Sequence, residues 1–173
     1  MVIGKPLFTP EQIQDKVRSL AAQISQDYEG KEILAIGILK GAFMFFSDLV
    51  RQIKVPLTVD FIIASSYVKT QTTGEVKIYY DVREPIERRH ILLIEDIIDT
   101  GITLNYIRER LLQRSPESLK ICTFLDKRER RIVDVPIDYV GFVIPNEYVV
   151  GYGLDYDNRY RNLPYIAVFK KSV

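Results

Sequence analysis

Apolar residues recur at two different spacings along this chain, and segments of the two kinds alternate. The first segment has helical spacing, with apolar side chains on one face over residues 13–24. Thr9 and Gln12 are separated as in a capping box, and Pro10 lies at the first helical position. Gly30 is a typical helix end, so the pattern predicts a helix that begins at Pro10 and stops before this glycine.

Two more segments show the same helical spacing, and short apolar runs separate all three. Residues 42–53 form an apolar face before Pro56, and residues 104–111 form another before Pro116. A polar stretch at residues 65–75 predicts a long loop. The runs that predict strands lie at residues 33–39, 57–63, 76–80, 90–94, 119–125, 139–144, 148–153 and 165–169.

This alternation of strands and helices predicts one α/β domain, with a parallel or mixed sheet that helices cover on both faces. The 173 residues contain no linker or repeat, and they suffice for a sizeable core. The formal net charge is +1, so the chain lacks the excess of basic residues typical of proteins that bind nucleic acids or membrane surfaces. We therefore expect neither partner, and no apolar run approaches the roughly 20 residues that span a bilayer.

The single cysteine, Cys122, excludes an internal disulfide and a multi-cysteine metal site. It lies in an apolar run, where an inert buried thiol is expected. One thiol is typical of a reducing compartment, and residues 1–10 lack the charged and apolar regions of a secretory signal. Together these features predict a cytoplasmic protein.

Small and acidic residues are concentrated between the predicted strand at 90–94 and the helix that follows it. They are Glu95, Asp96, Asp99, Thr100, Gly101 and Thr103. In open α/β sheets ligands bind beyond the carboxyl ends of the strands, and a turn before a helix can direct backbone N–H groups at a phosphate. Carboxylates in such a turn favour a ligand that also offers sugar hydroxyls or arrives with Mg²⁺. A ribose phosphate meets both demands.

Two other interpretations account for parts of this segment. Asp99 or Thr100 could cap the following helix, with Glu95 and Asp96 as solvated loop residues. Residues 97–101 also match the hydrophobic-hydrophobic-Asp-Thr-Gly signature of aspartic proteases. That signature needs a second aspartate and a β-rich surrounding, whereas here a helical pattern follows directly, which disfavours a protease.

Four segments in order along the chain resemble the purine phosphoribosyltransferases. Residues 94–103, Ile-Glu-Asp-Ile-Ile-Asp-Thr-Gly-Ile-Thr, resemble the phosphoribosyl-pyrophosphate signature in the form of the hypoxanthine (hypoxanthine-guanine) phosphoribosyltransferases. Leu39-Lys40-Gly41 resembles their pyrophosphate loop, and Ser66-Tyr67 the Ser-Tyr of their flexible catalytic loop. Residues 149–156, with Arg161, resemble their base- and metal-binding hood. The four together are specific to the branch that uses 6-oxopurines.

The resemblance implies a fold and an activity. The fold would be the type I phosphoribosyltransferase fold, a central, mostly parallel sheet flanked by helices. Residues 1–173 would form one domain, with a flexible loop at about 65–75 and a small hood made by the N-terminal segment and about 145–173. Such enzymes transfer 5-phosphoribosyl from phosphoribosyl pyrophosphate to N9 of hypoxanthine or guanine, giving IMP or GMP and pyrophosphate. They use Mg²⁺ and form homodimers or homotetramers in the cytoplasm.

The resemblance also implies roles for single residues in the phosphate half of the site. Asp99 and residues 100–103 would cradle the 5-phosphate. Glu95 and Asp96 would hold the ribose hydroxyls and Mg²⁺, and Asp155 would bind a second Mg²⁺. Pyrophosphate would meet the side chain or backbone of three further residues. The full sets are Asp99, Thr100, Gly101, Ile102 and Thr103 for the phosphate, and Lys40, Gly41 and Arg161 for pyrophosphate. The Lys40–Gly41 peptide is often cis in this family.

The purine would lie between the hood and the end of the sheet. Lys127 would donate to O6, Tyr148 would stack on the ring, and Val149 would offer its backbone carbonyl, with Asp155 close to the base. Asp99 is the general base that the family proposes at N7. As pyrophosphate leaves, the ribose carbon becomes positive, and Ser66 and Tyr67 would belong to a lid that keeps water out.

A regulator that keeps this fold but binds RNA is the alternative from another class. It would need a broad basic face and a uracil-type base site in place of Lys127 with Tyr148. The remaining basic cluster, Arg128, Arg130 and Arg131, is interpreted as a solvated turn. The aromatic residues at 43–46 are interpreted as core or as a contact between subunits.

Overall fold

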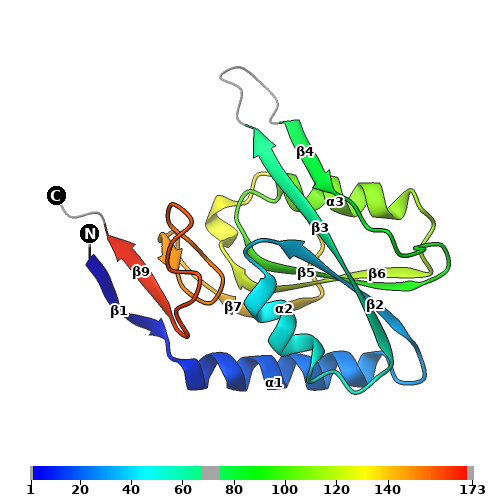
Figure 1. Cartoon of the computed structure of the whole chain (residues 1–173), viewed down its shortest axis with the longest axis horizontal. Coiled ribbons are helices and arrows are strands. Elements are labelled where there is room, and N and C mark those ends of the chain that lie inside the picture. Colours follow the sequence, from blue (N-terminus) through cyan, green and yellow to red (C-terminus); the bar gives the residue numbers. More distant parts are fainter. Residues whose placement is uncertain (1, 68–74, 171–173) are drawn as a thin grey trace.

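Six strands form the central sheet, in the order β4-β3-β2-β5-β6-β7 (Figure 1). The structure is a computed structural model, and it describes residues 2–67 and 75–170. All neighbouring strands are parallel except β4, which pairs antiparallel with β3. The strands of this sheet are β2 (Ile33–Leu39), β3 (Leu57–Tyr67), β4 (Glu75–Tyr80), β5 (His90–Ile98), β6 (Ser118–Asp126) and β7 (Tyr139–Val143).

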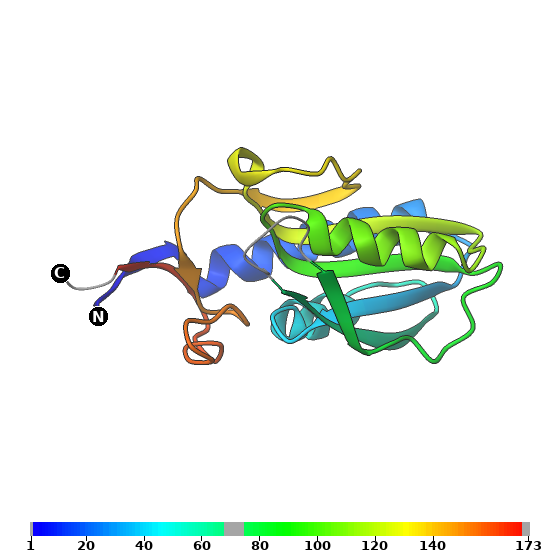
Figure 2. The same cartoon turned by 90° about the horizontal axis from the view of Figure 1, so that it is seen from above.

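Helices cover both faces of this sheet, as Figure 2 shows. Helices α1 (Pro10–Asp27) and α2 (Phe43–Val50) pack on one face, and α3 (Ile102–Leu112) packs on the other. Strand β5 serves both layers because its side chains alternate: Leu92 and Ile94 belong to the α1–α2 core, and Ile91 and Leu93 to the α3 core. The predicted α/β fold with helices on both faces is therefore confirmed.

Local sequence signals account well for the first helix. The Thr9 side chain accepts from the Gln12 backbone N–H at 3.2 Å, and the Gln12 side chain accepts from the Thr9 N–H at 2.9 Å. This is the reciprocal capping box that the spacing predicts. Pro10 is the first helical residue, as expected. In α2, Phe45 and Phe46 are buried in the core, whereas Phe43 is exposed.

A second, three-stranded sheet lies beyond the carboxyl ends of the parallel strands, in the order β1-β9-β8 (Figure 1). It consists of β1 (Val2–Phe8), β9 (Ile166–Lys170) and the short β8 (Val149–Val150), all paired antiparallel. Because β1 pairs with β9, the first and last described residues, Val2 and Lys170, lie beside each other. Strand β1 has no counterpart among the predicted strands. Among the described residues, no helix is long and apolar enough to cross a membrane.

Several predicted boundaries need correction. Strand β3 continues to Tyr67 and β4 begins at Glu75, so both ends of the predicted loop at 65–75 are strand, and residues 68–74 lie outside the described residues. Pairing with β4 satisfies the backbone of these polar β3 residues. Strand β5 likewise runs on to Ile98, where it pairs with β6. The cis peptide bond joins Leu39 and Lys40, one bond before the Lys40–Gly41 pair.

Candidate active site

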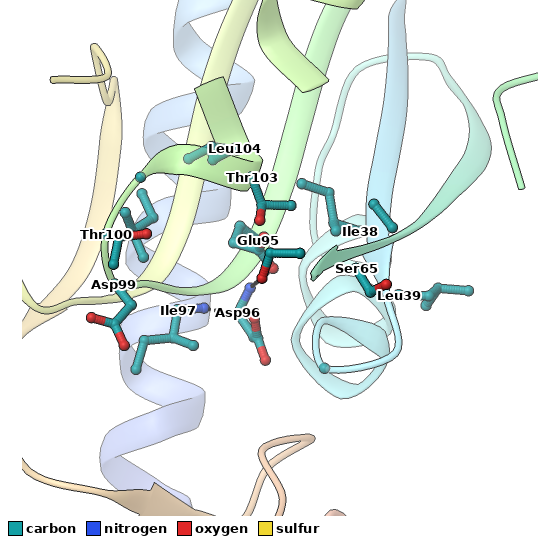
Figure 3. Close-up of a pocket in the computed structure, with 15 residues that line it drawn as sticks. Ile38, Leu39, Ser65, Glu95, Asp96, Ile97, Asp99, Thr100, Thr103 and Leu104 are labelled. Atoms are coloured by element: carbon teal, nitrogen blue, oxygen red, sulfur yellow. Dashed lines mark hydrogen bonds between the residues drawn. The ribbon is translucent and has the colours of Figure 1, made fainter. Parts of the chain in front are cut away.

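A cavity of about 500 Å³ opens at the carboxyl ends of β2, β3 and β5 (Figure 3). Gly41, which follows β2, and Ser65 and Ser66, at the end of β3, line one side. The other side comes from the end of β5 and the start of α3. The residues there are Glu95, Asp96, Ile97, Ile98, Asp99, Thr100, Gly101, Thr103 and Leu104. Parallel strands end at the same edge of a sheet, so residues far apart in sequence meet in this cavity.

The turn between β5 and α3 is held from outside the cavity. Gly101 adopts a φ of +84°, and a Cβ atom there would lie only 2.6 Å from the Val133 carbonyl oxygen, which excludes a side chain. The Thr100 carbonyl accepts from the backbone N–H groups of Ile132 and Val133 at 2.9 and 3.0 Å. Helix α3 begins at Ile102, so its first N–H groups and its dipole face the turn that lines the cavity. This arrangement suits a phosphate.

Glu95 and Asp96 are the electrostatic centre of the cavity. Burial raises the pKa of Glu95 well above its ordinary value, and the charge of the adjacent Asp96 raises it further. Burial also raises the pKa of Asp96, although the charge of Arg161 acts in the opposite direction. In the described part of the chain, neither carboxylate has an ion pair; each accepts a hydrogen bond from a backbone N–H. Within the described residues the two carboxylates therefore lack a directly paired cation, and Arg161 acts on Asp96 only through its charge.

The donor set of these two residues fits Mg²⁺. This ion prefers carboxylate oxygens, and it commonly takes only one or two from the protein, with water and substrate phosphates as the other ligands. No three metal-ligating side chains converge within residues 2–67 and 75–170, which agrees with such a partial set and not with an all-protein cage. Asp155 does not line the cavity; its carboxylate pairs with Arg161 at 3.0 Å.

The loop after β2 connects the cavity to the segment that follows β8. Lys40 is exposed at the end of β2, and a Cβ atom on Gly41 would overlap the Asp96 carboxylate. Gly153 in turn packs on Gly41 so closely that a Cβ atom would overlap the Gly41 carbonyl oxygen. Arg161 donates to the Gly153 carbonyl oxygen at 2.7 Å. Because of this chain of contacts, Arg161 lies near Asp96 even though it does not line the cavity.

Lys127 and Asp99 lie together at the ends of β6 and β5. The Lys127 backbone N–H donates to the Ile98 carbonyl oxygen at 3.0 Å, and the residue is only 8% exposed. Burial lowers the pKa of Lys127, and the charge of Asp99 opposes this effect. The Asp99 carboxylate accepts from Arg130 Nε at 2.8 Å. A buried lysine beside a carboxylate offers a donor and an acceptor to one ligand.

Tyr148 and Val149 stand at the start of the hood's strand β8. Val149 is buried, and Tyr148 is 51% exposed. The Tyr148 hydroxyl donates to the Asp155 carbonyl oxygen at 2.9 Å, which holds the exposed ring in place. Burial of its hydroxyl raises the pKa of Tyr148. A fixed, exposed aromatic ring is a suitable stacking surface for a planar base.

The structure thus brings only part of the expected site into one cavity. Residues 95–101, Thr103, Gly41 and Ser66 line it, while Tyr67 is described in its backbone alone. The expected residues outside the lining are Lys40, Ile102, Lys127, Tyr148, Val149, Asp155 and Arg161. The interpretation of Arg130 as a solvated turn residue misses its ion pair with Asp99. No local pattern indicates this contact, because Arg130 and Asp99 are 31 positions apart in the sequence.

Two comparisons agree with this geometry. The family model described as the phosphoribosyl transferase domain matches residues 7–157. A hypoxanthine-guanine phosphoribosyltransferase of Bacillus anthracis, solved with a HEPES molecule in its active site, superposes with a TM-score of 0.94. It is 49% identical and covers 98% of this chain and 100% of its own. The prediction of a mostly parallel phosphoribosyltransferase sheet is therefore confirmed.

Curated relatives narrow the class further. A hypoxanthine-guanine phosphoribosyltransferase of Bacillus subtilis is 49% identical over 172 residues, which are 99% of this chain and 96% of the relative. The bifunctional protein TilS/HprT of Listeria monocytogenes is 46% identical over the same length, but the chain spans only 26% of that relative. The chain belongs to the phosphoribosyltransferase family. Within this family it falls in the hypoxanthine phosphoribosyltransferase branch, and these relatives give no support to an RNA-binding regulator.

Proposed function

We propose that this chain transfers the 5-phosphoribosyl group of phosphoribosyl pyrophosphate to N9 of hypoxanthine or guanine, in purine salvage. The products are IMP or GMP and pyrophosphate. The observation that carries the proposal is the pair Glu95 and Asp96, two carboxylates without an ion-pair partner in the described residues, next to a helix N-terminus that suits a phosphate. A sugar phosphate that arrives with a divalent cation is complementary to both features.

In this proposal the turn before α3 binds the 5-phosphate through its backbone N–H groups and the Thr100 and Thr103 hydroxyls. Ile102 contributes its backbone only, as the first residue of α3, directly after Gly101. Glu95 and Asp96 hold the ribose hydroxyls. They also hold Mg²⁺, which when bound supplies positive charge to the leaving pyrophosphate. Asp155 is proposed as a further Mg²⁺ ligand.

The pyrophosphate is proposed to lie between the loop after β2 and the hood. Lys40 and the Gly41 backbone N–H contact it from one side, and Arg161 from the other. Arg161 is already fixed by its bond to the Gly153 carbonyl oxygen, so little side-chain entropy is lost on binding. Ser66 and Tyr67 close over the reacting carbon, which keeps water from it.

The base site is proposed to comprise Lys127, Tyr148 and Val149, with the Asp155 backbone near the ring. Lys127 donates to O6, which selects 6-oxopurines over adenine because adenine presents a donor there. Tyr148 stacks on the ring and the Val149 carbonyl accepts from it. Asp99 removes the proton from N7 as N9 attacks the ribose carbon. For this, Arg130 must release the Asp99 carboxylate or share it with the base.

The test is nucleotide formation from phosphoribosyl pyrophosphate and Mg²⁺ with each of hypoxanthine, guanine, xanthine, adenine and uracil. We expect turnover with hypoxanthine or guanine and none with adenine or uracil. Turnover with uracil alone, or with no base, would refute the proposal. Filter binding with RNA at rising salt tests the alternative, an RNA-binding regulator. Such a protein would bind RNA and lose affinity steeply as the salt concentration rises.

The proposal also covers the oligomeric state and the cellular location of the protein. We propose one catalytic unit, residues 1–173, whose hood is the N-terminal segment together with about residues 145–173, assembled as a homodimer or homotetramer. The exposed Phe43 on α2 is a candidate subunit contact. We also propose a cytoplasmic location, supported by a single buried thiol, Cys122, whose pKa burial raises. Light scattering after gel filtration measures the mass, and a monomer at micromolar concentration would contradict the assembly.

A further inference from the structure

Three consecutive residues of the hood have a positive φ, and only the middle one carries a side chain. Gly151 has a φ of +101°, Tyr152 +52° and Gly153 +98°. The two glycines are required, because Cβ atoms there would overlap the carbonyl oxygens of Tyr165 and Gly41. A tyrosine rarely adopts this conformation, which is strained and persists only where the surroundings enforce it. The contacts of the Tyr152 side chain are therefore informative.

The side chain of Tyr152 is anchored at both its ring and its hydroxyl. The residue is 6% exposed, and its ring lies 5.3 Å from that of Phe124, centroid to centroid. Its hydroxyl donates to Asp48 Oδ2 at 2.6 Å. This contact joins residues 104 positions apart, and it ties the hood to helix α2.

Asp48 is itself a fixed acceptor. Its Oδ2 atom also accepts from Gln14 Nε2 of α1 at 2.9 Å, and Oδ1 pairs with Arg51 at 2.6 Å. Helix α2 follows the pyrophosphate loop directly, since Phe43 N–H donates to the Lys40 carbonyl oxygen at 3.1 Å. The hydroxyl of Tyr152 thus connects the hood to the helix that continues this loop.

The neighbour of Tyr152 on the other side contacts the loop itself. Gly153 packs on Gly41, and its carbonyl oxygen accepts from Arg161 Nη1 at 2.7 Å. The second nitrogen of this guanidinium pairs with Asp155 at 3.0 Å. A shift of Gly153 would therefore displace both charged hood residues relative to Gly41.

We propose that Tyr152, through its hydrogen bond to Asp48, is a positioning residue that holds Gly153 against the pyrophosphate loop. By this contact it places Arg161 and Asp155 for pyrophosphate and its bound cation. The inference deepens the proposed function and rests on it. Neither Tyr152 nor Asp48 touches the substrate in this account, so both act only through the segment that they fix.

The test compares Tyr152→Phe with a matched variant, Tyr139→Phe. Tyr139 is also buried and donates to an aspartate, Asp27, at the same 2.6 Å, but at the opposite end of the sheet. Both substitutions remove one buried hydroxyl, so both should lower Tm by a few degrees. Only Tyr152→Phe should raise the KM for phosphoribosyl pyrophosphate and for pyrophosphate in the reverse reaction, by about tenfold. The KM for the purine should change less than about twofold in both.

A second readout requires no substrate. The N–H groups of Tyr152 and Gly153 donate to the Leu163 and Arg161 carbonyl oxygens at 2.8 and 2.9 Å. Amide hydrogen exchange at these two positions should accelerate about tenfold in Tyr152→Phe and stay unchanged in Tyr139→Phe. Asp48→Asn keeps an acceptor oxygen and should show a smaller change. Asp48→Ala combined with Tyr152→Phe should be no worse than Asp48→Ala alone, because Asp48→Ala already removes the Tyr152 contact.

Equal KM values for phosphoribosyl pyrophosphate in the two phenylalanine variants would overturn the inference, as would equal exchange rates. Additive effects in the double variant would also contradict it, because the two side chains would then act independently. If the wild-type chain forms no nucleotide at all, the proposed function fails. The exchange rates then still decide whether Tyr152 fixes Gly153.

Discussion

The two ends of the parallel sheet are both polar, but they differ in what their polar groups contact. At the amino end, the Tyr139 hydroxyl donates to Asp27, Lys120 pairs with the same carboxylate at 3.6 Å, and His90 Nδ1 lies 2.7 Å from Ser118 Oγ. Every one of these side chains has a partner within the protein. At the carboxyl end, Glu95 and Asp96 have no ion pair within the described residues; each accepts a backbone N–H, and their side chains contact each other.

This difference separates polar groups that stabilise the fold from polar groups that await a ligand. A partnered carboxylate gains stability from its cation, whereas two adjacent carboxylates without one cost stability in the free protein. A ligand that carries the missing positive charge recovers this cost on binding. Sequence composition hides the distinction, because the formal net charge of +1 counts charged residues without regard to their partners.

The largest expected effect is on catalysis at the carboxyl end. Asp99→Asn removes the proposed general base, and kcat should fall by about 10²-fold or more. Asp27→Asn is the matched change at the amino end, where an amide oxygen can still accept from Tyr139, and kcat should stay unchanged. Steady-state kinetics with hypoxanthine and guanine measure both. An unchanged kcat in Asp99→Asn would leave this residue as a phosphate-loop residue only.

An intermediate effect is expected on the choice of base. Lys127→Ala removes the proposed donor to O6, so the KM for hypoxanthine should rise by about tenfold or more, and discrimination against adenine should weaken. Lys120→Ala removes a lysine of the amino end and should lower Tm without changing the order of bases. The KM values of each variant for hypoxanthine and adenine measure this discrimination. Equal use of adenine by the wild-type chain would contradict the role of Lys127.

The smallest effect is on stability, and here two carboxylates should respond with opposite sign. Burial and the charge of Asp96 raise the pKa of Glu95, so Glu95 costs stability as the pH rises from its ordinary pKa, and this cost is complete above the raised pKa. Glu95→Gln should therefore stabilise the ligand-free protein at neutral pH, by on the order of 1 kcal/mol. The gain should shrink as the pH falls and Glu95 becomes protonated. Denaturant unfolding from pH 4 to pH 8 measures it.

Asp81 is the carboxylate compared with Glu95, and it forms ion pairs with Arg110 and Arg114. Burial raises its pKa, but the Arg110 hydrogen bond, the Val82 N–H and the charges of Arg110 and Arg114 outweigh burial and lower it. Its contribution to stability is present at neutral pH and is lost as the pH falls through the lowered value. Asp81→Asn should destabilise the protein at neutral pH by at most about 1 kcal/mol and leave activity unchanged. Shifts of equal sign in Glu95→Gln and Asp81→Asn would refute the comparison.

The fold can be predicted because each helix and strand has its own local signals, such as a capping box or an apolar run. The capping box of Thr9 and Gln12 fixes the start of α1, and the apolar run of β5 identifies a buried central strand. The predicted ends are less accurate where long-range pairing decides them. Strand β3 extends through polar Ser65 and Ser66 because β4 pairs with them, and β1 exists because β9 lies beside it. Both partner strands are predicted, but their pairing with β3 and β1 is not visible in the local sequence.

The candidate site likewise combines features that the local sequence predicts with contacts between distant segments that it does not predict. The spacing of residues 95–103 predicts a phosphate turn, and the structure places that turn at the start of α3. The resemblance to a family names Arg161, but only the folded chain shows that its guanidinium is held by the Gly153 carbonyl oxygen. The bonds from Arg130 to Asp99 and from Tyr152 to Asp48 join distant segments, so no local pattern could indicate them.

The most direct measurement of the central claim is calorimetric titration of phosphoribosyl pyrophosphate into the free protein, with and without Mg²⁺. The account predicts strong binding with Mg²⁺ and at least tenfold weaker binding without it, because Glu95 and Asp96 then face the ligand without a cation. In the double variant Glu95→Gln with Asp96→Asn, the dependence on Mg²⁺ should largely disappear. Equal affinity with and without Mg²⁺ in the wild-type chain would contradict the account.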